Sequence, residues 1–418
     1  MKDKKNVIIF VVDSARYYST GGLDDRDKLE MMDRFEDQSI YFSTAVSSAP
    51  SSVMSCASML TGLPAYYIAR NYEDYKYDDS AFYSLQRVLK ENNFEIRCNF
   101  IAREMRDKYG AILSQIEKSF WPSGLNDNAG LEKFGAYAWT NGQLNDVLRN
   151  FLNKRNGEEP LFLLNWYNIR LDPNTSKEVE NGIQLLKEND LWDNTIFLLL
   201  SDHGYMDPKR GYTPEKLKEM GLTHDLVLFD DNIRIPFYLK YPGCEPKIIE
   251  DQVSTYDIYP TILDLLDIPM PKNVGYDFYG KSLLNIIDSP SDDNKHFKMV
   301  RTDGRFFAQN DRCTSIRSKY FKYIIRPDSK EEEFYDLSKD SFEQNNVILE
   351  NSYSENIDEL KKYYEKTERD AIAFQTKYLI SKLLRETNIG VYISATKPDH
   401  QKNPKPGALS SGILEKGR

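Results

Sequence analysis

The side chains best suited to chemistry in this sequence are two aspartates and a histidine. Asp13 follows an apolar run near the N-terminus, and Asp202 and His203 follow another apolar run much later in the chain. Two carboxylates and an imidazole form a suitable ligand set for a divalent cation. A buried aspartate beside a histidine is also common as a simple hydrogen-bonded pair, so these three residues alone leave both interpretations open.

A serine-rich loop supplies a possible nucleophile. Residues 47–55 lead into a segment that we expect to be helical up to Gly62. A hydroxyl at the start of a helix lies near the positive end of the helix dipole, where oxyanions also bind. A serine that coordinates a metal ion has a lowered pKa and becomes a nucleophile. The simpler alternative is a serine that only caps the helix. Beside a metal site, the serine predicts attack on a phosphorus or sulfur centre.

Three apolar runs have the pattern of buried strands, at 6–12, 160–164 and 195–200. The polar residues that follow them are Asp13, then Asn165 and Asn168, then Asp202 and His203. An amphipathic segment at 177–189 predicts a helix between the last two runs. This alternation predicts an α/β fold with a mostly parallel central sheet flanked by helices. Ligands bind beyond the carboxyl ends of strands in such sheets.

The rest of the chain predicts further elements and two boundaries. We expect a strand at 233–240, a helix at 253–266, short strands at 298–326 and a long lysine-rich helix at 356–386. A polar stretch at 289–294 marks a boundary. The predicted organisation is therefore a catalytic α/β domain at 1–288, a small antiparallel subdomain at 289–350, and a helix with a loose tail at 351–418.

Composition excludes several classes of protein. The 418 residues are 40% hydrophobic and 13% aromatic, which is ample for a large core and excludes global disorder. A net charge of −10 argues against a nucleic-acid binder. Four widely separated cysteines argue against a disulfide framework. No apolar run is long enough for a signal peptide or a transmembrane segment, so we expect a cytoplasmic protein. No motif indicates an oligomeric state.

Six segments, taken in order, resemble the sulfatase branch of the alkaline phosphatase superfamily over roughly residues 5–350. They are 11–16 (VVDSAR), 52–62 (SVMSCASMLTG), 201–204 (SDHG), 221–236 (GLTHDLVLFDDNIRIP), 253–263 (VSTYDIYPTIL) and 319–337 (KYFKYII to EFYDL). The resemblance implies that Asp13, Asp202 and His203 bind one metal ion, with Ser52 as nucleophile and fourth ligand. The count back from Gly62 favours Ser52 over its neighbour Ser51. Mn²⁺, Mg²⁺, Ca²⁺ and Zn²⁺ are not distinguished by this ligand set.

The resemblance also implies that His224 contacts the substrate or the leaving group. The sequence has only four histidines, so few others could take this role. After the strand expected at 160–164, relatives commonly have H-x-x-D-x-H, whereas this chain has Asn165, Asn168 and Arg170. We expect these three to contact the substrate, and a second metal ion to lack ligands. Arg170 is equally suited to bidentate oxyanion binding or to an ion pair with Asp172.

One departure from the family separates two activities. Sulfatases have C-x-P-x-R or a close serine variant, which directs oxidation to formylglycine, and here the same register holds Ser52, Met54 and Cys56. A plain serine nucleophile is therefore expected, and with it a phosphomonoester or phosphodiester hydrolase that acts on a small-molecule or glycan ester. The alternatives are a sulfuric ester hydrolase, a phospho-group transferase acting on a cell-surface glycan, and a non-catalytic scaffold on an enzyme fold.

Overall fold

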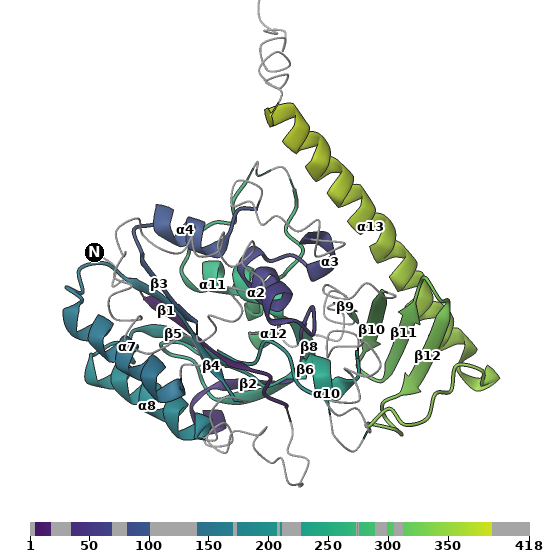
Figure 1. Cartoon of the computed structure of the whole chain (residues 1–418), viewed down its shortest axis with the longest axis horizontal. Coiled ribbons are helices and arrows are strands. Elements are labelled where there is room, and N and C mark those ends of the chain that lie inside the picture. Colours follow the sequence, from purple (N-terminus) through teal and green to yellow (C-terminus); the bar gives the residue numbers. More distant parts are fainter. Residues whose placement is uncertain are drawn as a thin grey trace, which may run out of the picture.

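The computed structural model describes residues 5–17, 35–68, 82–100, 140–169, 174–206, 210, 227–272, 274, 276–288, 299–304 and 312–386. Two sheets organise these residues, with helices packed around the larger sheet and one long helix against the smaller (Figure 1).

The central sheet has eight strands in the order β3-β4-β1-β5-β7-β2-β6, and β8 pairs with β2. Their bounds are β1 Asn6–Asp13, β2 Ile40–Val46, β3 Glu95–Phe100, β4 Leu161–Asn168, β5 Thr195–Leu200, β6 Arg234–Ile235, β7 Phe237–Lys240 and β8 Lys247–Ser254. The pairs of β1 with β4 and β5, of β3 with β4 and of β2 with β8 are parallel, and only the pairs involving β6 and β7 are antiparallel. The predicted fold class, an α/β protein with a mostly parallel central sheet, is confirmed.

The first strand is apolar throughout because both faces of the sheet are covered. Ile8, Phe10 and Val12 pack toward helices α7 (Asn141–Lys154) and α8 (Thr175–Glu188). Val7, Ile9 and Val11 pack on the opposite face, against a layer that contains α2 (Ser52–Thr61), α4 (Leu85–Glu91) and α11 (Ile258–Leu265). These six side chains alternate between the two faces, as a strand requires, and each is fully buried.

The helix predicted at 253–266 begins later than expected, so the prediction is wrong at its N-terminal end. Strand β8 continues to Ser254, since Val253 pairs with Ala45 of β2, and a 3₁₀ turn at Thr255–Asp257 precedes α11. The Asp257 carboxylate accepts a hydrogen bond from the Ser254 backbone N–H at 2.9 Å, which favours the turn. Apolar spacing alone could not locate this boundary, because the pairing partner of β8 lies far away in the sequence.

A second sheet, antiparallel in the order β12-β11-β10-β9, lies beside the first. Its strands are β9 Met299–Gly304, β10 Cys313–Ser318, β11 Phe321–Arg326 and β12 Glu331–Asp336. Two hydrogen bonds tie it to the loop before α2: Asp303 N–H donates to Ser48 O (3.1 Å) and the Thr302 hydroxyl donates to Ser47 O (2.7 Å). The small sheet therefore braces the serine-rich loop.

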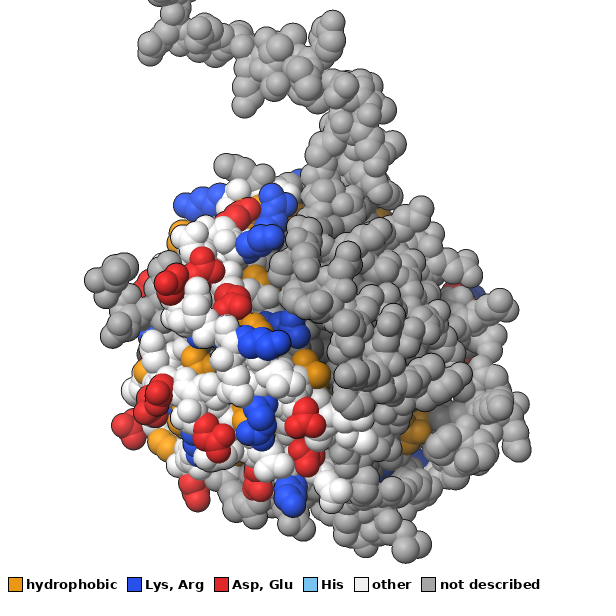
Figure 2. Space-filling view, turned by 60° about the vertical axis from the view of Figure 1, so that its left-hand side comes forward, with side chains coloured by type: hydrophobic (Ala, Val, Ile, Leu, Met, Phe, Trp, Pro, Cys, Tyr) orange, Lys and Arg blue, Asp and Glu red, His pale blue; other side chains and the backbone are white. Residues whose placement is uncertain are grey.

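The last described element is the helix α13 (Ser354–Glu386), which crosses the small sheet and then extends away from the rest (Figure 1). Ile357 and Leu360 pack with Tyr323 and Phe334 of the sheet, and Glu368 pairs with Arg301 of β9 at 2.6 Å. Within the described ranges, no helix combines the length and the apolar character needed to cross a bilayer. On the face shown in Figure 2, the described Lys and Arg side chains are interspersed with Asp and Glu.

Candidate active site

The two aspartates and the histidine meet at the carboxyl end of the central sheet. Asp13 ends β1, Asp202 and His203 follow the adjacent parallel strand β5, and one potential ligand atom from each lies within 4.8 Å of the others. All three side chains are buried. Because parallel neighbouring strands end at the same edge of a sheet, the apolar runs that define β1 and β5 bring these residues together.

Neighbouring side chains hold the carboxylate of Asp13. Its Oδ2 accepts hydrogen bonds from Nε1 of Trp166 (3.4 Å) and from Nδ2 of Asn168 (3.3 Å) on β4, while its Oδ1 accepts one from the Ser14 hydroxyl (2.7 Å). Register explains the first two, since Asn168 lies opposite Asp13. Sequence analysis missed Trp166. The signal was present, because a residue two positions before Asn168 on a strand lies on the same face.

Ser14 links the two carboxylates. Its backbone N–H donates to Oδ1 of Asp202 at 3.1 Å, and its hydroxyl binds Asp13. The backbone of Ser14 is left-handed, with φ of 64°, a conformation that residues other than glycine adopt at a cost in free energy. The chain therefore holds a strained residue at the point where it leaves the sheet and passes between the two acids.

The site concentrates negative charge. Burial, and secondly the nearby Asp202 carboxylate, raises the pKa of Asp13 from 3.8 to about 6. His203 and the hydrogen bonds from Ser14 and Trp166 oppose this rise. A cation between the carboxylates would remove the repulsion and favour both ionised forms.

The potential ligand atoms of the site fit a divalent metal ion. Nδ1 of His203 lies 2.7 Å from the carbonyl oxygen of Gly204, and a carbonyl only accepts, so Nδ1 donates there and Nε2 is the ring nitrogen that faces Asp202 and Ser52. Nε2 lies 3.3 Å from Oδ2 of Asp202, which is buried and accepts no hydrogen bond from the described residues. A proton on Nε2, or a metal ion between Nε2 and this oxygen, would make the contact favourable. Asp13, Asp202 and His203 therefore form a possible metal site.

Ser52 faces this site from the start of α2. Its hydroxyl oxygen lies 3.2 Å from Nε2 of His203, and the residue is partly exposed, so a substrate can reach it. Ser51, the N-cap of the helix, is buried and its side chain makes no capping hydrogen bond. Ser55, one turn later, donates to the carbonyl oxygen of Asp202 at 2.8 Å and fixes α2 to the metal-site segment. The geometry thus favours Ser52 over Ser51 as the reactive hydroxyl.

The segment after His203 is held tightly by its backbone. Gly204 N–H donates to Asn232 O at 2.8 Å, and a Cβ at Gly204 would lie only 2.2 Å from Asp231 O, so no larger residue fits there. The Arg16 guanidinium donates to the carbonyl oxygens of Tyr205 (2.6 Å) and Met206 (2.5 Å). Arg16 therefore braces this loop.

The remaining predicted site residues have different positions. Asn168 lies at the site as a donor to Asp13, and its contact with a substrate stays a prediction. Asn165 is fully buried within β4, and its contact with a substrate also stays a prediction. Arg170 and His224 lie outside the described residues.

Comparisons with known proteins agree with this architecture. Residues 218–370 match the family model described as N-sulphoglucosamine sulphohydrolase, C-terminal. An arylsulfatase of Clostridium perfringens is 28% identical over 182 residues, which are 42% of this chain and 34% of that protein. An ulvan-active sulfatase of Formosa agariphila is 29% identical over 172 residues, 39% of this chain and 31% of that protein. The matched segments thus span about a third of the length of these relatives.

Solved structures share the fold over nearly the whole chain. A 2-O GAG sulfatase superimposes with a TM-score of 0.68 at 15% identity and covers 88% of this chain and 93% of its own. The phosphonate monoester hydrolase of Agrobacterium radiobacter has a TM-score of 0.61 at 14% identity, covering 90% of this chain and 96% of its own. At these identities the likeness concerns the fold.

The fold and the site define an α/β protein with a possible metal centre and a serine hydroxyl directed at it. Together with the family match over residues 218–370 and the similar sequences, they support a narrower class, the sulfatase family of the alkaline phosphatase superfamily. The family predicted from the six motifs is confirmed.

Proposed function

We propose that this protein is a metal-dependent ester hydrolase that cleaves a phosphomonoester or phosphodiester with Ser52 as nucleophile. The observation that carries the proposal is the position of the Ser52 hydroxyl, 3.2 Å from Nε2 of His203 in the site formed with Asp13 and Asp202. The N-cap of α2 is Ser51, so helix capping does not explain why the Ser52 hydroxyl faces these ligands.

Asp13, Asp202, His203 and Ser52 would hold the ion. Bound there, a divalent ion lowers the pKa of the serine hydroxyl and offsets negative charge that develops on the ester. The chain's own residues do the rest. Hydrogen bonds from Trp166, Asn168 and Ser14 orient the Asp13 carboxylate, and the Gly204 carbonyl fixes the His203 tautomer.

The proposed reaction has two steps. The Ser52 hydroxyl loses its proton to solvent and its oxygen forms a bond to phosphorus as the bond to the leaving oxygen breaks. His224, in the role that the family resemblance gives it, supplies a proton to the departing alcohol and regains one from solvent. Water then attacks the phosphorus on Ser52, which restores the serine hydroxyl and releases phosphate from a monoester substrate or a phosphomonoester from a diester substrate. If another alcohol replaces water, the product is a transferred phospho group.

A sulfuric ester hydrolase is the second candidate, favoured by the relatives. Both curated relatives described above are named sulfatases, and a structural neighbour was solved with its substrate D-glucosamine-2-N,6-O-disulfate. Against this stands the sequence of α2, in which Ser52, Met54 and Cys56 occupy the register where sulfatases carry the formylglycine signal. The organic part of the substrate, a small molecule or a glycan, follows from neither argument.

The test is turnover of an aryl phosphate, an aryl phosphodiester and an aryl sulfate, each with added Mn²⁺, Mg²⁺, Ca²⁺ or Zn²⁺ and again with a chelator. Ser52→Ala is compared with Ser51→Ala, a matched control one residue away. The proposal predicts phosphoester turnover that needs metal, disappears in Ser52→Ala and survives in Ser51→Ala. Turnover confined to the aryl sulfate would replace it with the sulfatase candidate.

A further inference from the structure

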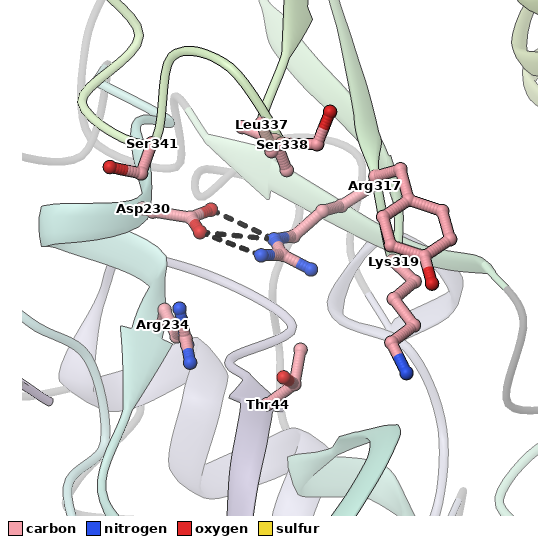
Figure 3. Close-up of a pocket in the computed structure, with 9 residues that line it drawn as sticks. Thr44, Asp230, Arg234, Arg317, Lys319, Leu337, Ser338 and Ser341 are labelled. Atoms are coloured by element: carbon pink, nitrogen blue, oxygen red, sulfur yellow. Dashed lines mark hydrogen bonds and ion pairs between the residues drawn. The ribbon is translucent and has the colours of Figure 1, made fainter.

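A cavity lies between the two sheets, apart from the metal site. It has a volume of about 250 Å³, and none of Asp13, Ser52, Asp202 and His203 lines it. Its walls come from β2 and β6 of the central sheet, from α10 (Asp230–Ile233), from the turn between β10 and β11, and from residues that follow β12 (Figure 3). The lining residues that matter here are Thr44, Asp230, Arg234, Arg317, Lys319 and Ser341.

The single carboxylate in this lining is already neutralised. Arg317 binds Asp230 through three hydrogen bonds, from Nε to Oδ1 at 2.9 Å and to Oδ2 at 3.2 Å, and from Nη2 to Oδ2 at 2.7 Å (Figure 3). From the far side Lys322, which does not line the cavity, binds Oδ1 of Asp230 at 2.5 Å. These two cations hold the pKa of Asp230 well below its usual range, against the effect of burial. Asp230 therefore stays ionised, and its negative charge is neutralised by the two cations Arg317 and Lys322.

Positive charge is in excess around the cavity. Four cations, Arg210, Arg234, Arg317 and Lys322, face three carboxylates, and Lys319 stands at the rim. The three carboxylates are Asp230, Asp231 and Glu343. Burial also raises the pKa of Glu343 to about 7, which lowers the negative charge of the group further near neutral pH. Lys319 forms only an exposed ion pair with Glu250, at 3.2 Å.

Arg234 forms no salt bridge with a described carboxylate, and its charge acts on Asp230 only at longer range. Its Nε and Nη2 donate to the carbonyl oxygen of Ser43, and its guanidinium lies over the Tyr17 ring at 4.0 Å from the ring centre. Among the described residues no carboxylate pairs with it and its Nη1 has no hydrogen-bond partner. An arginine stacked on a ring keeps its N–H groups in a fixed plane, ready for a planar or tetrahedral oxyanion.

Two hydroxyls complete the lining. The side chains of Thr44 and Ser341 border the cavity, and within the described parts of the chain neither makes a hydrogen bond. A water molecule occupies about 30 Å³ in the liquid, so the cavity can hold one tetrahedral oxyanion together with waters. The donors available are therefore a guanidinium, an ammonium and hydroxyls, a set that suits phosphate, sulfate or carboxylate.

We propose that this cavity is a second oxyanion site, which binds a phosphate, sulfate or carboxylate group either free or carried on the substrate. Its position suits the second source. Arg234 pairs in register with Val46, the residue that leads into the loop before Ser52, and Tyr17 lies three positions after Ser14. The cavity therefore flanks the candidate active site along the same edge of the sheet. Binding of a substrate-borne group rests on the proposed function, whereas binding of a free anion does not.

The first experiment measures binding without turnover. Inorganic phosphate is titrated into the full chain by calorimetry, at constant ionic strength and with a chelator present. We expect Arg234→Gln to weaken binding about tenfold, the effect of losing one charge-assisted contact. Lys319→Glu should weaken binding about threefold, since its charge is exposed. Glu250→Gln, which releases Lys319 from its partner, should strengthen binding.

The controls separate this cavity from the metal site. Arg87→Gln removes an exposed arginine that pairs with Glu91 at 3.2 Å, outside the cavity, and should leave phosphate binding unchanged. Ser52→Ala should also leave it unchanged. The proposal is overturned if Ser52→Ala abolishes binding while Arg234→Gln and Lys319→Glu do not alter it. Lys319 and Glu250 are 52% and 75% exposed, so their variants should fold even if Arg234→Gln does not.

A second experiment identifies the source of the anion. Turnover of an aryl phosphate is compared with that of the same ester bearing an added carboxylate. If the substrate carries the group, Lys319→Glu raises KM for the carboxylated ester alone and leaves kcat unchanged. If Lys319→Glu weakens phosphate binding but changes KM for neither ester, the site takes a free anion. A chain that hydrolyses no ester would refute the proposed function, and the calorimetry would still decide whether this site exists.

Discussion

Replacing Asp202 with asparagine should have opposite effects on stability without and with metal. Burial and the neighbouring Asp202 raise the pKa of Asp13 from 3.8 to about 6, equivalent to a penalty of about 3 kcal/mol on its ionised form. Burial is the larger cause, so we assign about 1 kcal/mol of this to Asp202. The new amide would also donate to Nε2 of His203, 3.3 Å from the atom it replaces, which adds about 1 kcal/mol. The metal-free variant should therefore be about 2 kcal/mol more stable than the wild type at pH 8.

Metal should reverse this order. An ion at about 100 times its dissociation constant stabilises the wild type by about 2.7 kcal/mol, and the variant has lost one anionic ligand. Urea unfolding with a chelator, and then with Mn²⁺ or Ca²⁺, measures both effects, with the exposed Asp193→Asn as a control that should change stability by less than about 0.5 kcal/mol. The reasoning is refuted if Asp202→Asn destabilises the metal-free protein, or if metal stabilises both proteins equally.

Three further predictions follow from the same contacts. The pKa of Asp13 is raised in the folded state, so its contribution to the stability of the metal-free protein is complete below pH 3.8 and is lost as pH rises through about 6. Because protons compete with a metal ion for the Asp13 carboxylate, metal affinity measured by calorimetry should fall below pH 6. Arg317→Ala leaves the buried Asp230 without its bidentate partner and should lower the free energy of unfolding by about 3–5 kcal/mol, whereas the exposed Arg87→Ala should cost less than about 0.5 kcal/mol in the same urea titration. Trp166→Phe removes a donor to Asp13 but no metal ligand, and should weaken metal binding about tenfold; an unchanged affinity would show that this bond does not orient the carboxylate.

The site could be located from sequence because it lies at the ends of fully buried strands. Residues 6–12 and 195–200 are continuous apolar runs, a pattern that a strand covered on both faces imposes, and the structure has strands at Asn6–Asp13 and Thr195–Leu200. Once those ends were known, the parallel arrangement placed Asp13 beside Asp202 and His203. No long-range information was needed beyond the handedness and order that such folds favour.

Other features depended on pairings that the sequence does not display. Strand β2 has a half-exposed pattern, and its partners β6, β7 and β8 come from much later in the chain. The hydrogen bond from Trp166 to Asp13 requires the register of β4 against β1, and the bond from Ser14 N–H to Asp202 requires a left-handed backbone at a non-glycine residue. Tertiary structure fixed both, so local pattern could suggest the residues but not their roles.

The measurement that tests the central claim most directly is peptide mass spectrometry of Ser52 after rapid acid quenching of the protein with metal and an aryl phosphate. The account predicts that the Ser52 peptide gains one phosphoryl group, that the modification maps to Ser52 and not Ser51, and that it is absent in Ser52→Ala and in protein treated with a chelator. A Ser52 peptide lacking two hydrogens, with turnover of aryl sulfate alone, would contradict the account and identify a formylglycine sulfatase.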